Sequence, residues 1–201
     1  MVLKAHRPNA ALSHLAAIAL LALALAAAGC VKAHDIVRLP QKTPIAVAYV
    51  MDDDHQGLVG EVPDSLKKEV AKVLGERNLE PFEIPFQSYA QVFVPVRDSK
   101  KRLARLSNSE APYTLLVETK AVYFAQLSGR YRWTVSLKLS VADKDGTTEP
   151  MTAESELSTF MDFEHEKEAQ TVASIAEDLA RRAGALLDEF LSAVDSAEKK
   201  N

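Results

Sequence analysis

RYRWTVSLKLSV, residues 130–141, decides the fold, because its side chains alternate strictly between apolar and polar. The apolar face carries Tyr131, Trp133, Val135, Leu137, Leu139 and Val141. The polar face carries Arg132, Thr134, Ser136, Lys138 and Ser140. This period of two predicts a strand of an antiparallel sheet, with one face packed under helices and the other in water.

Two further strands are expected beside this one. Residues 113–124 predict a long strand that leads into the turn at Ser128-Gly129-Arg130. Asp143-Lys-Asp-Gly146 is a strong hairpin signal, and residues 148–160 follow as a third, more polar strand. The middle of the chain therefore predicts three consecutive strands.

An apolar strand and an amphipathic helix are expected earlier in the chain. Residues 45–51 form a run typical of a strand buried on both faces. Asp64 or Ser65 is suited to cap the helix that follows, and Pro81 ends it. The apolar stripe of this helix is Leu66, Val70, Val73 and Leu74.

The remaining elements are a short strand and two helices. Residues 82–86 predict an edge strand because of Pro85, whereas residues 87–97 suit either a strand or a packing loop. Residues 98–107 predict a short helix, and helix dominates residues 166–194. The apolar face of this last helix is Val172, Ile175, Leu179, Leu186, Leu187, Phe190 and Val194.

The resulting order is β-α-β-α-β-β-β-α. It predicts a single α+β domain, whose mixed, mostly antiparallel sheet is covered on one face by two or three helices. The other face of the sheet is expected to stay open.

The first 29 residues have the three parts of a secretory signal. Lys4 and Arg7 lie in a basic start, residues 15–28 are an unbroken apolar run, and the run ends in small residues. About 14 apolar residues are fewer than the ~20 that span a bilayer. Removing this segment takes two cations from a chain of net charge −4 and leaves about −6.

Ala27-Ala28-Gly29-Cys30 resembles the lipobox of bacterial lipoproteins. The resemblance implies cleavage before Cys30, the only cysteine, followed by acylation of its thiol and amine. Ala27 stands where that family most often has Leu, which leaves open a cut after Ala28 or an uncleaved anchor helix. Val31, rather than Asp, follows the cysteine, and in that family this favours the outer membrane, facing the periplasm. The expected divisions are a signal peptide at 1–29, a lipidated tether at 30–43, a globular domain at 44–196 and a frayed tail at 197–201.

The order of elements from 44 to 194 also resembles small α/β domains of envelope proteins. These are the TolB N-terminal domain, the penicillin-binding-protein activator lipoproteins and the curli-export lipoprotein family. In them an apolar strand leads into a helix, a hairpin carries a Gly-rich turn, and a helix closes the chain.

Catalytic and cofactor motifs are absent from the sequence. The cluster Asp52-Asp53-Asp54-His55 has the residue types of a metal site, but consecutive side chains diverge, so a solvated acidic loop is favoured. His165-Glu166 begins like a zincin helix and lacks the second histidine. Phosphate loops and nucleophile motifs do not occur, and a mildly acidic domain does not favour nucleic acid. We therefore expect no enzyme, no metal and no cofactor.

Tyr123, Arg130 and Arg132 are the candidate partner-binding residues, because Tyr and Arg are enriched in interface hot spots. The leading hypothesis is a lipid-anchored, non-catalytic binding or scaffolding protein with a protein partner in the envelope. The alternatives are a subunit of an oligomeric envelope or export assembly, pairing through residues 82–86 or 148–160, and a metal-dependent enzyme centred on Asp52–His55.

Overall fold

The structure, a computed structural model, describes residues 35–53, 57–59, 62–89, 98–106, 110–127, 129–161 and 168–199. The chain divides into two compact units, Met1–Asp35 and Ile36–Asn201. The predicted signal segment and Cys30 therefore lie outside the described residues. None of the described helices combines the length and apolarity that crossing a membrane requires.

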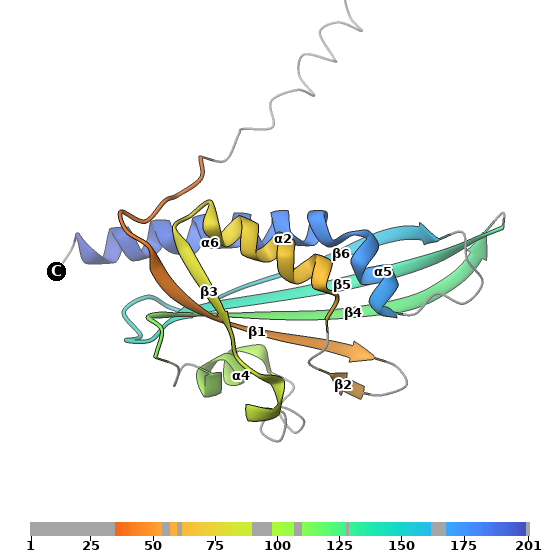
Figure 1. The fold of residues 1–201 in the computed structure, drawn as a ribbon, viewed down its shortest axis with the longest axis horizontal. Coiled ribbons are helices and arrows are strands. Elements are labelled where there is room, and N and C mark those ends of the chain that lie inside the picture. The colour runs from red at the N-terminus through yellow and green to blue at the C-terminus, as the bar shows by residue number, and fades with distance from the viewer. Residues whose placement is uncertain are drawn as a thin grey trace, which may run out of the picture. The chain divides into compact units, whose positions relative to one another are not determined.

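A six-stranded mixed sheet forms the frame of the second unit (Figure 1). Its main path runs β2-β1-β4-β5-β6, and β3 pairs with β1 beside β2. β1 is parallel to β3 and β4, whereas the β1–β2, β4–β5 and β5–β6 pairs are antiparallel. The strands are β1 (Thr43–Asp53), β2 (Gly57–Val59), β3 (Leu79–Glu83), β4 (Tyr113–Leu127), β5 (Arg130–Asp143) and β6 (Met151–Met161).

Three helices cover one face of the sheet, and a fourth lies on the other (Figure 1). The first face carries α2 (Asp64–Gly75), α5 (Glu168–Ser174) and α6 (Ala176–Glu198), and the second carries α4 (Ser99–Leu106). A short 3₁₀ turn, η1 (Phe86–Ser88), follows β3. The predicted α+β class and order of elements are confirmed, with β2 as an additional short strand.

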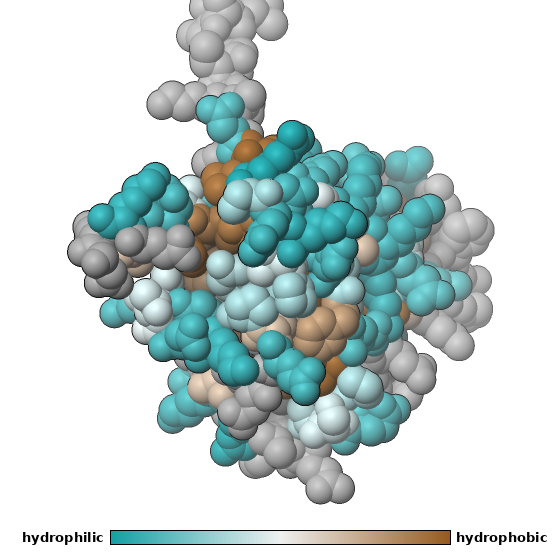
Figure 2. Space-filling model, turned by 60° about the vertical axis from the view of Figure 1, so that its left-hand side comes forward, coloured by the Kyte–Doolittle hydropathy of each residue, from teal (hydrophilic) through white to brown (hydrophobic). Residues whose placement is uncertain are grey.

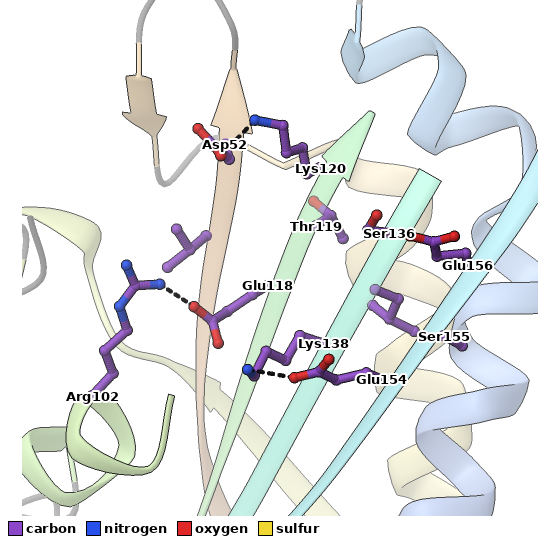
Figure 3. A pocket seen from close by; sticks show the side chains of 12 residues that line it. Asp52, Arg102, Glu118, Thr119, Lys120, Ser136, Lys138, Glu154, Ser155 and Glu156 are labelled. Atoms are coloured by element: carbon purple, nitrogen blue, oxygen red, sulfur yellow. Dashed lines mark hydrogen bonds and ion pairs between the residues drawn. The ribbon is translucent and has the colours of Figure 1, made fainter. Parts of the chain in front are cut away.

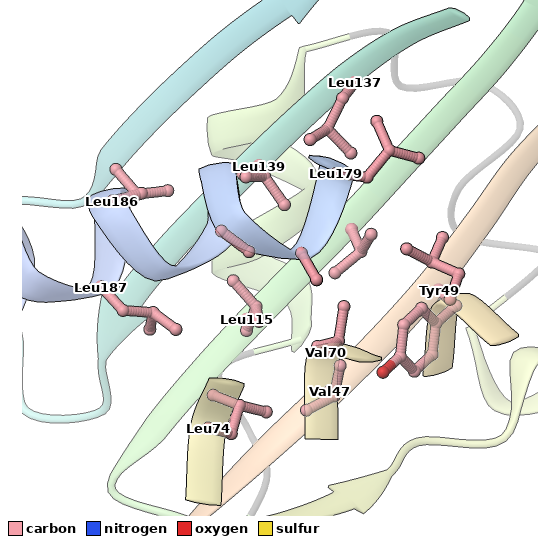
Figure 4. Packing of buried hydrophobic residues seen from close by; sticks show 14 of the residues in the cluster. Val47, Tyr49, Val70, Leu74, Leu115, Leu137, Leu139, Leu179, Leu186 and Leu187 are labelled. Atoms are coloured by element: carbon pink, nitrogen blue, oxygen red, sulfur yellow. The ribbon is translucent and has the colours of Figure 1, made fainter. Parts of the chain in front are cut away.

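The main core lies between the sheet and α2, α5 and α6. The odd-numbered side chains of β1, β4 and β5 meet the helix stripes there, as in the packing of Val47, Leu115 and Leu139 against Leu74 and Leu187 (Figure 4). The predicted apolar face of residues 130–141 is confirmed: Val135, Leu137, Leu139 and Val141 are fully buried, and Tyr131 lies partly exposed at its end. On the face drawn in Figure 2, hydrophilic surface predominates, and apolar surface occurs in separate areas.

A second, smaller core lies under α4. Leu103 and Leu106 of α4 pack on Ala48, Val50, Leu116 and Ala142, together with Tyr89. The Tyr89 hydroxyl donates to the carbonyl oxygen of Tyr49 at 2.9 Å, and burial raises the pKa of both tyrosines well above the ordinary range. The sheet face expected to stay open is thus partly covered. Ser140, expected in water, is buried and shares a hydrogen bond of 3.1 Å with Thr152.

The first predicted helix ends earlier than expected. α2 ends at Gly75 rather than at Pro81, and the left-handed φ of 60° at Asn78 then turns the chain into β3. Pro81 lies inside β3, which begins three residues before the predicted strand at 82–86. Asp64 begins α2, but no side chain caps this helix.

The long C-terminal helix is divided in two. Ile175 separates α5 from α6 with a φ of −122° and a ψ of 18°, outside the helical region. The predicted apolar stripe nevertheless runs through both helices, with Val172, Leu179 and Phe190 buried. The break at Ile175 changes the direction of the chain without interrupting the helical spacing of the apolar residues, so the sequence does not reveal it.

A buried ion pair joins α6 to the turn after α2. Arg77 donates to Asp188 through Nε at 2.9 Å and through Nη2 at 2.7 Å, and its Nη1 donates to the Val73 carbonyl oxygen. The Val37 N–H also donates to Asp188 Oδ1, at 3.0 Å. Residues 36–39, which we expected in the tether, therefore make hydrogen bonds to the domain, and Leu39 adds another to Arg77.

Candidate partner-binding surface

The open part of the second sheet face lies beyond α4. It carries the even-numbered side chains of β5 and β6 and those of β4 from Glu118 to Phe124. Their register places Glu118, Lys138 and Glu154 in one row across the sheet, and Lys120, Ser136 and Glu156 in the next. Because a strand turns alternate side chains to one face, all six project from the same surface.

A cavity of about 670 Å³ occupies this surface, and we call it the charged groove (Figure 3). α4, β1, β4, β5 and β6 all contribute to its lining. The charged residues that line it are Asp52, Arg102, Glu118, Lys120, Lys138, Glu154 and Glu156. With four acids and three bases, the groove offers both signs of charge to a partner.

The first row across the groove alternates in sign. Arg102 of α4 binds Glu118 of β4, and Lys138 of β5 binds Glu154 of β6 (Figure 3). The Arg102 and Glu118 side chains are only 11% and 12% exposed, whereas the Glu154 side chain is 64% exposed. The row is therefore buried at α4 and opens to solvent toward β6.

The second row lacks its second cation. Lys120 Nζ lies 2.9 Å from Asp52 Oδ2, but Ser136 stands where the first row has Lys138. Glu156 of β6 lies opposite Ser136, and none of the described residues forms an ion pair with it. Both rows end on a glutamate at the edge of the sheet.

Apolar side chains lie beside the groove on the same face, at the end of the strands near the β4–β5 turn. A register shift between Tyr123 and Ala125 makes Phe124 the extra residue of a β-bulge. Phe124 and Phe160 are 66% and 51% exposed. The guanidinium carbon of Arg132 lies 4.9 Å from the centre of the Phe124 ring, and Arg132 is the register partner of Phe160. We call Val122, Phe124, Arg132 and Phe160 the aromatic end.

The three residues predicted from the sequence are not all together. Arg132 belongs to the aromatic end, and Arg130 is exposed at the start of β5. Tyr123 is the register partner of Trp133 and packs against it and Tyr131, with ring centres 5.7 and 5.9 Å away. Tyr123 is thus on the helix-covered face, where it is 47% exposed.

The candidate partner-binding residues chosen from the sequence do not include Phe160, Phe124 or the glutamates of β6. A signal for Phe160 exists, because it continues the period of Glu154, Glu156 and Ser158 and so falls on the polar face. A signal for Phe124 exists as well, because it continues the period of Glu118, Lys120 and Val122.

The predicted acidic cluster is described only in part. Asp52 lies in β1 and pairs with Lys120, whereas Asp54 and His55 lie outside the described residues, as does His165. Within the described part of the chain, no three His, Cys, Asp or Glu side chains are placed to hold a metal ion.

No protein-family model and no curated protein matches the chain. Among solved structures, it is similar to the PelC dodecamer from Paraburkholderia phytofirmans, at 13% identity and a TM-score of 0.39, over 69% of this chain and 84% of that one. It is also similar to the lipoprotein GNA1162 from Neisseria meningitidis, at 13% identity and a TM-score of 0.40, over 69% and 99% of the two chains. A minor lipoprotein from Acinetobacter baumannii is 14% identical with a TM-score of 0.37, over 74% of this chain and 94% of that one.

Proposed function

We propose that this protein is a lipid-anchored component of the bacterial envelope that binds a protein partner through the open face of its sheet and catalyses no reaction. The observation that carries the proposal is the contrast between the two faces. Three helices cover most of one face, whereas the other keeps a groove of about 670 Å³ and an adjoining group of exposed aromatic rings.

The chemistry of this face is that of recognition. Ion pairs join six of the groove's seven charged side chains, so groups of both signs are presented to a partner in a defined arrangement. Exposed aromatic side chains next to an arginine are typical of interaction sites on soluble domains. The location at the outer membrane follows from the lipobox resemblance at Ala27–Cys30 and the Val31 that follows it.

The anchor is tested by labelling cells with a clickable fatty acid. We expect label on the wild-type protein and none on Cys30→Ser. A wild-type protein without label would refute the lipid anchor and leave the binding face to be tested separately.

The binding face is tested by photo-crosslinking in intact cells. A photo-reactive amino acid at Ser136, in the groove, is expected to capture a partner, whereas the same group at Glu189, on the solvent side of α6, is expected to capture none. Equal capture from both positions, or none from Ser136, would contradict a role for the open face.

A second candidate function is a subunit of an oligomeric envelope assembly. The observation in its favour is β6, an edge strand of eleven residues at the end of the sheet. The size of the detergent-solubilised protein distinguishes the two, because a discrete oligomer of this chain alone supports the assembly.

A further inference from the structure

The two edges of the sheet differ in how they are protected against pairing with another strand. β3, at one edge, has five residues and contains Pro81, which lacks an N–H to donate. β6, at the other, runs for eleven residues without proline or glycine, and its register with β5 is continuous from Met151 to Met161. No further strand pairs with β6 among the residues that the structure describes. Natural sheets blunt such long, regular edges, so β6 is the edge suited to accept a strand.

The charges of β6 select against a second copy of the same strand. Its only charged residues are Glu154 and Glu156. Antiparallel self-pairing centred on Ser155 sets Glu154 opposite Glu156, and centring on Glu156 sets that residue opposite its own copy. Like charges directly opposite each other destabilise a strand pair. Centring on Leu157 avoids direct opposition, yet it still places the four carboxylates on one face within three residues of the centre.

The same charges favour a basic strand. The first row of the groove runs Arg102, Glu118, Lys138, Glu154, and the next member of an alternating row is a cation. The second row ends on Glu156, which has Ser136 rather than a cation beside it. Glu154 and Glu156 are two residues apart, so the matching cations on an added strand are also two residues apart.

On the other face of the sheet, the side chains of β6 are mostly apolar, so an added strand is expected to place apolar residues beside them. Met151, Ala153, Leu157 and Met161 are partly buried and pack against the main core. An added strand would extend this apolar layer by placing its own apolar side chains beside Ala153 and Leu157. Alternation between the two faces is what a strand provides.

We propose that β6 binds an extended segment of a partner protein as an additional strand, and that this segment carries two Lys or Arg residues separated by one residue and flanked by apolar residues. The proposal rests on the proposed binding function and names the chemistry of its partner. Backbone hydrogen bonds would supply the affinity, and Glu154 and Glu156 would set the choice of sequence.

The test uses the full-length protein in detergent and the acetylated, amidated peptide Val-Thr-Val-Lys-Val-Lys-Val-Thr-Val. Fluorescence polarisation of the labelled peptide measures affinity, and hydrogen–deuterium exchange locates the binding site. We expect saturable binding with slower exchange in residues 151–161 and unchanged exchange in residues 79–83. The same peptide with Glu in place of Lys, and the same peptide with N-methylated backbone nitrogens, are expected not to bind.

Glu156→Gln and Glu189→Gln form a matched pair of variants. Glu156 lies on the edge strand β6, whereas Glu189 lies exposed on α6, and both changes remove one negative charge. Glu156→Gln is expected to weaken binding about two- to fivefold, as for one cross-strand ion pair, and Glu189→Gln to leave it unchanged. The circular dichroism of both variants shows that they are folded.

Several outcomes would overturn the proposal: no binding, equal binding of the N-methylated peptide, equal effects of the two variants, or protection outside residues 151–161. A concentration-dependent dimer with residues 151–161 protected before peptide is added would overturn it in favour of a second copy. Loss of peptide binding with capture from Ser136 retained would remove this inference and leave the proposed function standing.

Discussion

Replacing Asp188 by Ala is expected to cost a large part of the stability of the domain. The carboxylate accepts two hydrogen bonds from Arg77 and one from the Val37 N–H, and both charged side chains are only 5% exposed. The variant removes the buried partner of the guanidinium and leaves only the half-exposed Glu76 carboxylate, 3.9 Å from Nη1, which costs about 3–5 kcal/mol. A domain of ordinary stability has about 5–15 kcal/mol in total.

Gly184 of α6 packs directly against the Arg77 side chain and gives a second way to perturb the same ion pair. A Cβ added there would lie 2.9 Å from Arg77 Nη2 and 3.1 Å from Val73 Cγ1. In an ordinary helix, Gly→Ala gains about 1 kcal/mol. Here we expect a loss of about 1–3 kcal/mol, because the ion pair holds the guanidinium in place. In the Asp188→Ala background Arg77 is free to move, so Gly184→Ala is expected to cost less.

Urea unfolding of the full chain in detergent measures these differences, with the fluorescence of the single, buried Trp133 as the probe. Asp195→Ala is the matched control, since its ion pair with Lys199 is exposed and contributes about 0.3–0.5 kcal/mol. A cost for Asp188→Ala no larger than that of the control, or a stabilising Gly184→Ala, would refute the reasoning.

Three further changes have defined outcomes. Burial, with a smaller contribution from the Glu83 carboxylate, raises the pKa of Tyr49 and Tyr89. The stability that the two neutral tyrosines contribute is therefore fully present below about pH 10 and is lost as the pH rises further. Tyr89→Phe is expected to make this alkaline loss shallower in urea titrations at several pH values. Asn78→Ala is expected to cost about 1–2 kcal/mol, because Ala tolerates the left-handed φ poorly and the hydrogen bond to the Leu39 carbonyl oxygen is lost. Asn78→Gly is expected to cost less, and equal costs for the two variants would show that φ is irrelevant. Phe160→Thr is expected to change the midpoint of unfolding little, because the ring is exposed, but to reduce crosslinking from Ser136; unchanged crosslinking would exclude the aromatic end from the interface.

The strands and the main core are predictable from the sequence because they follow a local period. Alternation in residues 130–141 identifies β5 and its buried face, and the stripes of α2 and α6 identify the helices that cover it. The side of the sheet on which α4 packs is not local information. A hint is present in residues 45–51, since a strand apolar on both faces needs a cover on both, and α4 is that second cover.

The charged groove depends on register, which the sequence does not show directly. Glu118, Lys138 and Glu154 share a row only because of how β4, β5 and β6 are aligned. A slip of one residue would turn every side chain of a strand to the opposite face. The bulge at Phe124 is likewise not evident from the sequence, although it turns the residues after it to the opposite face of the sheet.

The hydrogen bonds that hold residues 36–43 also determine how the domain meets mechanical load. Val37, Leu39 and Thr43 are bonded to Asp188, Arg77 and Asn78, and the chain then enters β1 between β4 on one side and β3 and β2 on the other. A pull on the N-terminal segment first loads these bonds and then draws β1 lengthwise against two parallel neighbours. Such shear loads many bonds together, whereas peeling an edge strand opens them singly. Under tension from its N-terminal side, the domain should therefore unfold slowly, with resistance set by the rate of unfolding rather than by its equilibrium stability.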